Sequence, residues 1–126
     1  MPVPDAITSD LSGKRLLVVE DDAMVGMTLV SYLEQLGAQV FWGSSVAEAQ
    51  RGMDDGALPD MAIVDLNLDG ETSAPVLDRL IGDGVRIVLC TGYEESSIAE
   101  RFRGLPRAET PFTRAKIRRL LNIGGG

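Results

Sequence analysis

Short apolar runs recur along the chain at nearly even intervals, and polar or acidic residues end most of them. Four runs cover residues 16–19, 39–42, 61–64 and 85–90. Runs of this length predict strands, and those without polar alternation predict strands buried on both faces of a sheet. A weaker segment, 107–109, is predicted as a fifth short strand. The strands start near residues 16, 38, 61, 85 and 107, so 22 to 24 residues separate one start from the next.

Between these runs, apolar residues return every three or four positions, which is the spacing of an amphipathic helix. Gly37 is a natural stop for the longest such segment. Ser45 and Glu48 have the spacing of a capping box and predict a helix start. Pro75 fits the first turn of the helix that follows the third strand. The predicted helices cover residues 24–36, 46–53, 75–81, 98–103 and 113–122.

The alternation of strands and helices predicts the fold class. Connections of this length are too long for hairpins, so neighbouring strands should run parallel. We expect an α/β domain of the flavodoxin-like (βα)5 type, a doubly wound parallel sheet with helices on both faces and strand order 2-1-3-4-5. The expected organisation is a flexible leader at residues 1–13, one domain at 14–122 and a flexible tail at 123–126.

The composition excludes several classes of function. The 126 residues suffice for one domain and include no histidine, which excludes a Ser–His–Asp triad, a histidine base and histidine-bearing zinc sites. Cys90 is the single cysteine, so no internal disulfide can form and a reducing compartment is indicated. Because the chain lacks a long apolar stretch and a signal-peptide pattern, we expect a cytoplasmic protein with no membrane association.

Charge is distributed unevenly along the chain. The net charge of −7, from 12 basic and 19 acidic residues, argues against nucleic-acid binding. Residues 98–126 nevertheless carry a balance of +5, and the first 97 residues carry −12. The basic segment is either a partner surface or an ordinary solvated face. Its basic residues are Arg101, Arg103, Arg107, Arg114, Lys116, Arg118 and Arg119.

Several polar side chains follow the predicted strands directly. Glu20 and Asp21 follow the first strand, Asp65 the third, Thr91 the fourth and Thr110 the fifth. In the expected strand order the first and third strands are neighbours, so their three carboxylates should meet within about 5 Å. A hard divalent cation would relieve the repulsion between them, and Mg2+ prefers such oxygen ligands. The sequence therefore predicts a magnesium site.

Asp65 is also a candidate nucleophile. An aspartate can attack a phosphoryl group and form an acyl phosphate when a metal neutralises the transferring group. The simpler interpretation is that each aspartate only ends a strand or caps a helix. We expect that interpretation to hold for Asp22, which stands at the entrance to the first helix.

These motifs resemble the receiver domains of two-component response regulators, over nearly all of residues 14–122. The resemblance rests on Val18-Val19-Glu20-Asp21-Asp22, Ile63-Val64-Asp65-Leu66, Thr91-Gly92 and Thr110-Pro111-Phe112. The segments 65–71 and 90–93 are also similar to the subgroup called FAT GUY receivers, which often occur as single domains.

The resemblance implies a role for each site residue. Asp65 would be the phosphoacceptor, Asp21 a direct Mg2+ ligand and Glu20 a ligand acting largely through water. The backbone carbonyl of Asn67 would be a further ligand. Thr91 would be the switch hydroxyl that hydrogen-bonds the phosphoryl group, although a strand-end threonine can also be purely structural.

The chain departs from the family where receivers carry a lysine, because Thr110 stands at that position. The lysine would pair with the phosphoryl group, and a charge-assisted hydrogen bond of this kind is typically about 1.5–3 kcal/mol. We expect weakened or differently coupled phosphotransfer, and loss of phosphorylation is the alternative. Arg107, Arg114 or Lys116 are candidates to supply the missing charge.

The main functional hypothesis is a receiver that takes a phosphoryl group from a histidine kinase or histidine phosphotransfer protein. It would then change its affinity for an output protein, through the basic 98–121 face if that face is a partner surface. It would be a signalling domain and not an enzyme, apart from weak autodephosphorylation. The alternatives are a pseudo-receiver that acts without phosphorylation and a flavin-binding domain. The acids after the first strand disfavour the flavin domain, because they would repel its phosphate.

Overall fold

The structure is a computed structural model that describes residues 11–91, 98–109 and 113–121. Most of the predicted leader, the predicted tail and Thr110 lie outside the described residues. Within the described residues, no helix is long and apolar enough to cross a membrane.

A five-stranded parallel sheet forms the centre of the domain. Its strands lie in the order β2-β1-β3-β6-β7, and every neighbouring pair is parallel. Counted as the five strands of the sheet, this is the predicted order 2-1-3-4-5, so the predicted topology is confirmed. The strands are β1 (Arg15–Val19), β2 (Gln39–Gly43), β3 (Met61–Asp65), β6 (Arg86–Thr91) and β7 (Arg107–Glu109).

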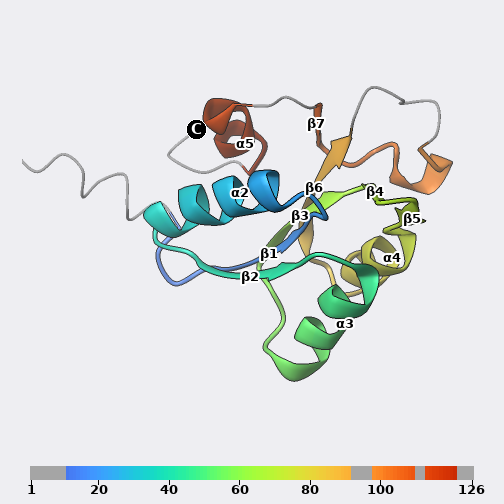
Figure 1. The fold of residues 1–126 in the computed structure, drawn as a ribbon, viewed down its shortest axis with the longest axis horizontal. Helices are drawn as coiled ribbons and strands as arrows, with labels where there is room; N and C mark the ends of the chain where they lie inside the picture. Colours follow the sequence, from blue (N-terminus) through green and yellow to red (C-terminus); the bar gives the residue numbers. More distant parts are fainter. Residues whose placement is uncertain (1–10, 92–97, 110–112, 122–126) are drawn as a thin grey trace, which may run out of the picture.

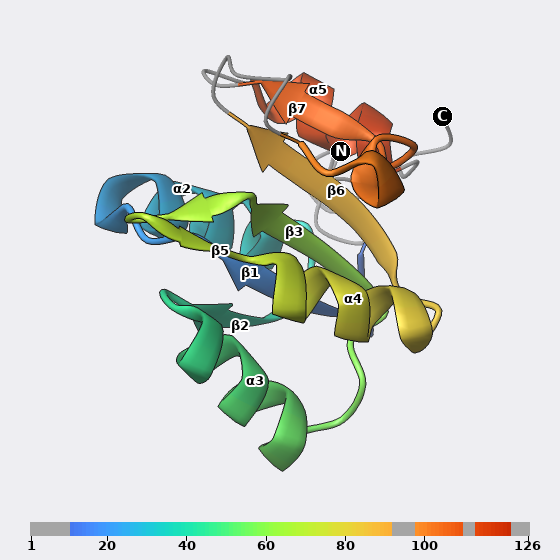
Figure 2. The same ribbon diagram turned by 90° about the vertical axis from the view of Figure 1, so that its right-hand side faces the viewer.

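Helices cover both faces of the sheet, as Figures 1 and 2 show. Alternate residues of β1 belong to two separate cores, with Leu16 and Val18 in one and Leu17 and Val19 in the other. The first core includes buried residues of α2 (Ala23–Gln35) and α5 (Arg114–Leu121). The second includes those of α3 (Val46–Asp55) and α4 (Ala74–Gly82). A strand buried on both faces has no polar positions, which explains the continuous apolar runs.

The predicted helix at 98–103 is wrong in type and length. The segment forms only a short 3-10 helix, η2 (Glu100–Phe102), held by bonds such as that from the Phe102 amide to the Ala99 carbonyl at 2.9 Å. Phe102 is fully buried, so packing fixes the turn. Gly104 and Pro106 follow at once and prevent a longer helix.

A small hairpin that the sequence analysis did not predict lies between β3 and α4. Strands β4 (Asn67–Leu68) and β5 (Glu71–Thr72) pair antiparallel across a two-residue loop. Asp69 and Gly70 in this loop have φ of 54° and 89°, as a type I′ turn requires. The side-chain oxygen of Asn67 accepts a hydrogen bond from the Gly70 amide at 2.9 Å, which closes the turn.

The packed part of the chain begins before the predicted boundary at residue 14. Leu11 is fully buried, and its amide donates to the Leu36 carbonyl at 2.8 Å. Leu11, inside the predicted leader at 1–13, therefore belongs to the packed part of the chain.

Two glycines allow a test of the hairpin turn. A side-chain carbon added at Gly70 or at Gly82 would meet open space, but only Gly70 has a positive φ. We expect Gly70→Ala to lower the free energy of unfolding by about 1–2 kcal/mol, because L-residues are strained there. Gly82→Ala in α4 should raise it by about 0.5 kcal/mol. Urea denaturation of both variants measures this, and equal effects would contradict the assigned turn.

Candidate functional site

The pairing of β1 with β3 brings distant acids to one edge of the sheet. Val19 is the Cα partner of Val64, so Glu20 and Asp65 leave the two strands side by side. One carboxylate oxygen each from Glu20, Asp21 and Asp65 lies within 4.8 Å of the other two. The structure thus brings together the three acids that the sequence predicts to meet.

The three acids in the loop after β1, Glu20, Asp21 and Asp22, have different environments. Glu20 is only 4% exposed, and its Oε2 accepts a hydrogen bond from the Asp22 amide at 3.0 Å. Asp21 is exposed to solvent. Asp22 caps α2, because its Oδ1 accepts from the Val25 amide at 3.0 Å. The predicted capping role of Asp22 is confirmed.

Asp65 ends β3 with a half-buried side chain. Its Oδ1 accepts a hydrogen bond from the Asn67 amide at 3.1 Å. Burial raises the pKa of Asp65, and the negative charge of Asp21 adds to this, against the opposing effect of the hydrogen bonds from the Asn67 amide and from Glu20. The carboxylate is therefore held in place and partly desolvated.

Glu20 has the largest electrostatic perturbation in the cluster. Burial raises the pKa of Glu20 to about 8, with further contributions from the nearby charges of Asp65 and Asp21. Its side chain also shares a hydrogen bond with Asp65. At neutral pH the pair therefore holds a proton between its two carboxyl groups in the absence of metal.

The donor set fits a hard divalent cation such as Mg2+. All three ligands are carboxylate oxygens, and burial together with mutual repulsion makes a compensating charge favourable. Cys90 lies beside Asp65 in the sheet register, but its thiol is a poor candidate ligand. Burial and the charges of Asp65 and Glu20 raise the pKa of Cys90 and keep the thiol protonated.

The remaining predicted site residues lie around this cluster. Thr91 ends β6 one residue beyond Cys90, the Cα partner of Asp65, and is 4% exposed. Asn67 begins β4, and its side-chain oxygen accepts a hydrogen bond from the Gly70 amide. The main-chain carbonyl of Asn67 is therefore its candidate metal ligand. Thr110 lies outside the described residues.

Two basic residues of the segment 98–126 contact side chains of this domain that lie away from the acidic cluster. The Arg114 guanidinium lies 5.2 Å from the centre of the ring of Tyr32, which is near the far end of α2 from Asp22. Arg101 binds both carboxylate oxygens of Asp78 at 2.9 Å and lies over the Phe102 ring. Neither position favours direct contact with Asp65.

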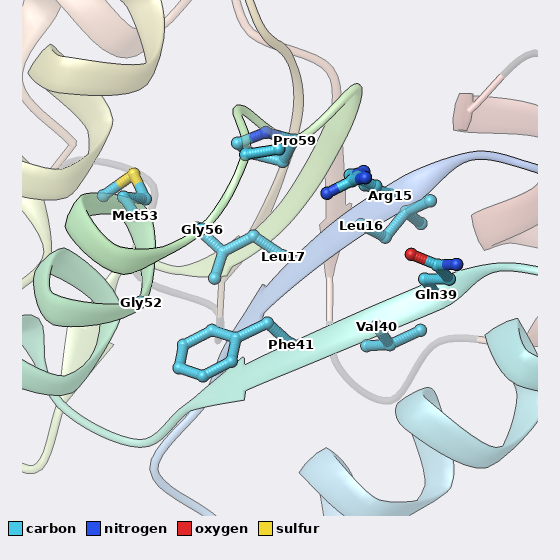
Figure 3. A pocket seen from close by; sticks show the side chains of 11 residues that line it. Arg15, Leu16, Leu17, Gln39, Val40, Phe41, Gly52, Met53, Gly56 and Pro59 are labelled. Atoms are coloured by element: carbon cyan, nitrogen blue, oxygen red, sulfur yellow. The ribbon is translucent and has the colours of Figure 1, made fainter.

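A hollow of about 230 Å³ lies along β2 and α3 (Figure 3). Its lining includes Phe41, Met53 and Pro59 and one charged side chain, Arg15. None of the three clustered acids lines this hollow, so it is separate from the candidate site.

Trp42 contacts the candidate site, and the sequence did not predict this contact. Its indole Nε1 donates a hydrogen bond to the backbone carbonyl of Glu20 at 2.9 Å. The available signal was a tryptophan in a short strand, since a buried indole N–H requires an acceptor. The sequence does not indicate which acceptor.

Several solved structures are similar to this domain in sequence and fold. SdrG from Sphingomonas melonis Fr1 matches with 34% identity and a TM-score of 0.76, over 86% of this chain and 93% of that one. The BeF3-activated conformation of SdrG from Pseudomonas melonis Fr1 matches with 32% identity and a TM-score of 0.72, over 88% and 95%. A response regulator receiver domain (CheY-like) from Methylobacillus flagellatus matches with 23% identity and a TM-score of 0.73, over 86% and 96%. No family model and no curated protein matches the sequence.

The raised pKa of Glu20 predicts a pH dependence of stability without metal. The folded protein keeps this proton up to about pH 8, whereas the unfolded chain loses it near 4.5. The free energy of unfolding should therefore fall as pH rises from 5 to 8, by on the order of 3 kcal/mol. Urea denaturation in a chelator measures this.

Glu20→Gln is the control for this pH dependence, because it removes the titrating group. The variant should lose most of the decrease, and excess Mg2+ should restabilise the wild type at pH 8. An identical slope in variant and wild type would contradict the assignment to Glu20.

Proposed function

The chain belongs to the receiver-domain family of response regulators, and from this we propose that it accepts a phosphoryl group on Asp65 from a phosphohistidine donor. The donor would be a histidine kinase or a histidine phosphotransfer protein. The domain would work in signalling in the cytoplasm. The cluster of Glu20, Asp21 and Asp65 is the observation that carries the proposal.

The proposed reaction uses Asp65 as the nucleophile. A carboxylate oxygen of Asp65 attacks the phosphorus, the P–N bond of the phosphohistidine breaks, and the imidazole nitrogen takes the electron pair. The product is an acyl phosphate on Asp65. Mg2+, held by Glu20, Asp21, Asp65 and the Asn67 carbonyl, would neutralise charge on the transferring group.

Deprotonation of the pair is a necessary step before the reaction. Because Glu20 and Asp65 share a hydrogen bond, a proton has to leave before both can act as anions. Metal binding and proton release are coupled in such sites. Weak autodephosphorylation, by attack of water on the acyl phosphate, would complete the cycle.

Thr91 is the proposed switch hydroxyl. It ends the strand next to β3, at the level just beyond Asp65, so a phosphoryl group on Asp65 would be within reach of its side chain after a small shift. Movement there would be passed to the segment that follows β6. The basic 98–121 face would then change its affinity for an acidic output protein.

One comparison supports a domain that responds to a phosphoryl group. SdrG, 32% identical over 88% of this chain, has a BeF3-activated conformation. Beryllofluoride has the tetrahedral shape and negative charge of a phosphoryl group, so its use as an activator in a relative supports a phosphoryl-responsive site here.

Thr110 favours a second candidate, a pseudo-receiver that binds partners without phosphorylation. The family lysine is replaced by a neutral residue, which can give at most one neutral hydrogen bond in place of a charge-assisted one. The acidic cluster would then serve a metal or only the fold.

Phosphorylation can be detected by intact mass. Incubation with acetyl phosphate or a phosphohistidine donor, together with Mg2+, should add the mass of one phosphoryl group to the wild type. Asp65→Asn should show no adduct, because the amide is not a nucleophile. Chelation of Mg2+ should reduce the adduct strongly.

The same experiment separates the two candidates. An adduct on the wild type that persists in Asp65→Asn would place the phosphoacceptor elsewhere. Absence of an adduct with every donor, while partner binding is retained, would establish the pseudo-receiver instead.

Restoring the lysine is a further test. Thr110→Lys should increase the initial rate of phosphorylation by about tenfold or more, because a charged hydrogen bond of about 1.5–3 kcal/mol is regained. The increase is measured as adduct formation over time. An unchanged rate would indicate that another cation already fills this role.

Single alanine variants of Arg107, Arg114 and Lys116 identify that cation. The variant that removes a substituting charge should form the adduct about tenfold more slowly than the wild type. Unchanged phosphorylation in all three would exclude them as replacements for the lysine.

A further inference from the structure

Trp42 connects the edge strand β2 to the acidic site. It is the only tryptophan of the chain, it is partly buried, and it packs against the core shared with α2. Its Nε1 donates to the Glu20 carbonyl at 2.9 Å. The bond therefore links the end of β2 to the first residue of the loop that carries two of the three acids.

This carbonyl has particular importance because it belongs to the peptide group that joins Glu20 to Asp21. The peptide group is planar, so fixing its oxygen fixes one backbone angle of Glu20 and one of Asp21. These angles help to set the direction in which both side chains leave the backbone. A hydrogen bond at this oxygen therefore helps to orient two members of the cluster at once.

The indole of Trp42 also packs against α2. A side-chain carbon added at Gly26 would clash with the indole atoms Cζ2 and Cε2. Glycine in a helix interior costs about 1 kcal/mol relative to alanine, so this helix accepts a local cost at the point where Trp42 packs. Gly26 and the Glu20 carbonyl thus hold the ring from two elements.

The backbone supports the same loop on either side. The Glu20 amide donates to the Gly43 carbonyl at 3.2 Å, and the Asp22 amide donates to Glu20 Oε2 at 3.0 Å. Both bonds need the Glu20 backbone in its present orientation. The indole hydrogen bond is a further contact to the same Glu20 backbone.

We propose that Trp42 is a positioning residue for the acidic site, holding the Glu20–Asp21 peptide so that both carboxylates face Asp65. The proposal deepens the proposed function and rests on it for the metal, but not for the geometry of the loop. Loss of such outer contacts typically reduces metal affinity by about 10–100-fold.

Phe41 offers a matched control on the same strand. It packs over a helix glycine as Trp42 does, because a side-chain carbon at Gly52 would clash with its ring. Figure 3 shows Phe41 pointing from β2 toward α3, into the hollow. No hydrogen bond ties its side chain to the acidic loop, since phenylalanine has no side-chain donor.

The first measurement is Mg2+ affinity by titration calorimetry. Trp42→Phe keeps a ring but removes the N–H, and we expect about tenfold weaker Mg2+ binding. Gly26→Ala should weaken binding similarly, because the added carbon displaces the indole. Phe41→Leu should stay within about twofold of the wild type. Equal affinity in wild type, Trp42→Phe and Gly26→Ala would overturn the proposal.

The second measurement needs no metal. Amide hydrogen exchange at Asp22 in a chelator should accelerate about tenfold in Trp42→Phe, and should not in Phe41→Leu, because the Asp22 amide bonds the side chain that Trp42 positions. Unchanged exchange would overturn the proposal. If the wild type binds no Mg2+, the proposed function is wrong. The exchange rate of the Asp22 amide still tests the positioning role of Trp42 in that case.

If the variants do not fold, a measurement on the wild type alone tests the proposal. The indole N–H of Trp42 should exchange at least about tenfold more slowly than that of a free tryptophan in the same buffer. Exchange at the free rate would show that the indole bond is not maintained, and would overturn the proposal without any substitution.

Discussion

The parallel pairing of β1 with β3 is the constraint on which the site depends. The sheet fixes Val19 opposite Val64, so the acids that follow cannot separate without breaking strand pairing. Two hydrophobic cores, one on each face, hold these strands in register. The repulsion between the carboxylates is therefore stored in a rigid frame, where a cation or a shared proton relieves it.

The fold was largely predictable because its signals are local. Apolar runs gave four strands, and side chains at helix entrances gave two starts: Asp22 accepts from the Val25 amide and Ser45 from the Glu48 amide at 3.1 Å. The meeting of Glu20 with Asp65 followed from strand order. The spacing of apolar residues did not predict the type of the 98–103 segment, although Gly104 and Pro106 argue against a longer helix there.

The missed features depend on contacts between distant residues or on two-residue turns. The Asp69–Gly70 dipeptide is a recognised hairpin signal, so the small hairpin could have been predicted. The acceptor of the Trp42 indole could not, because Glu20 and Trp42 are 22 positions apart and nothing in the sequence between them marks that contact.

The last helix is fastened at both ends to other parts of the domain. The Tyr32 hydroxyl donates to the Arg114 carbonyl at 3.4 Å, and Arg86 donates to the Leu121 carbonyl at 2.7 Å. By contrast, η2 is held by the burial of Phe102 in the second core, and its exposed Arg101–Asp78 pair with α4 is a kind of contact that contributes little to stability.

The close fit of Trp42 over Gly26 also limits how this sequence can change over evolutionary time. A larger residue at position 26 displaces the indole while Trp42 is present. Replacement of Trp42 by a smaller residue first removes that conflict. The two positions are therefore expected to change in a fixed order, Trp42 before Gly26.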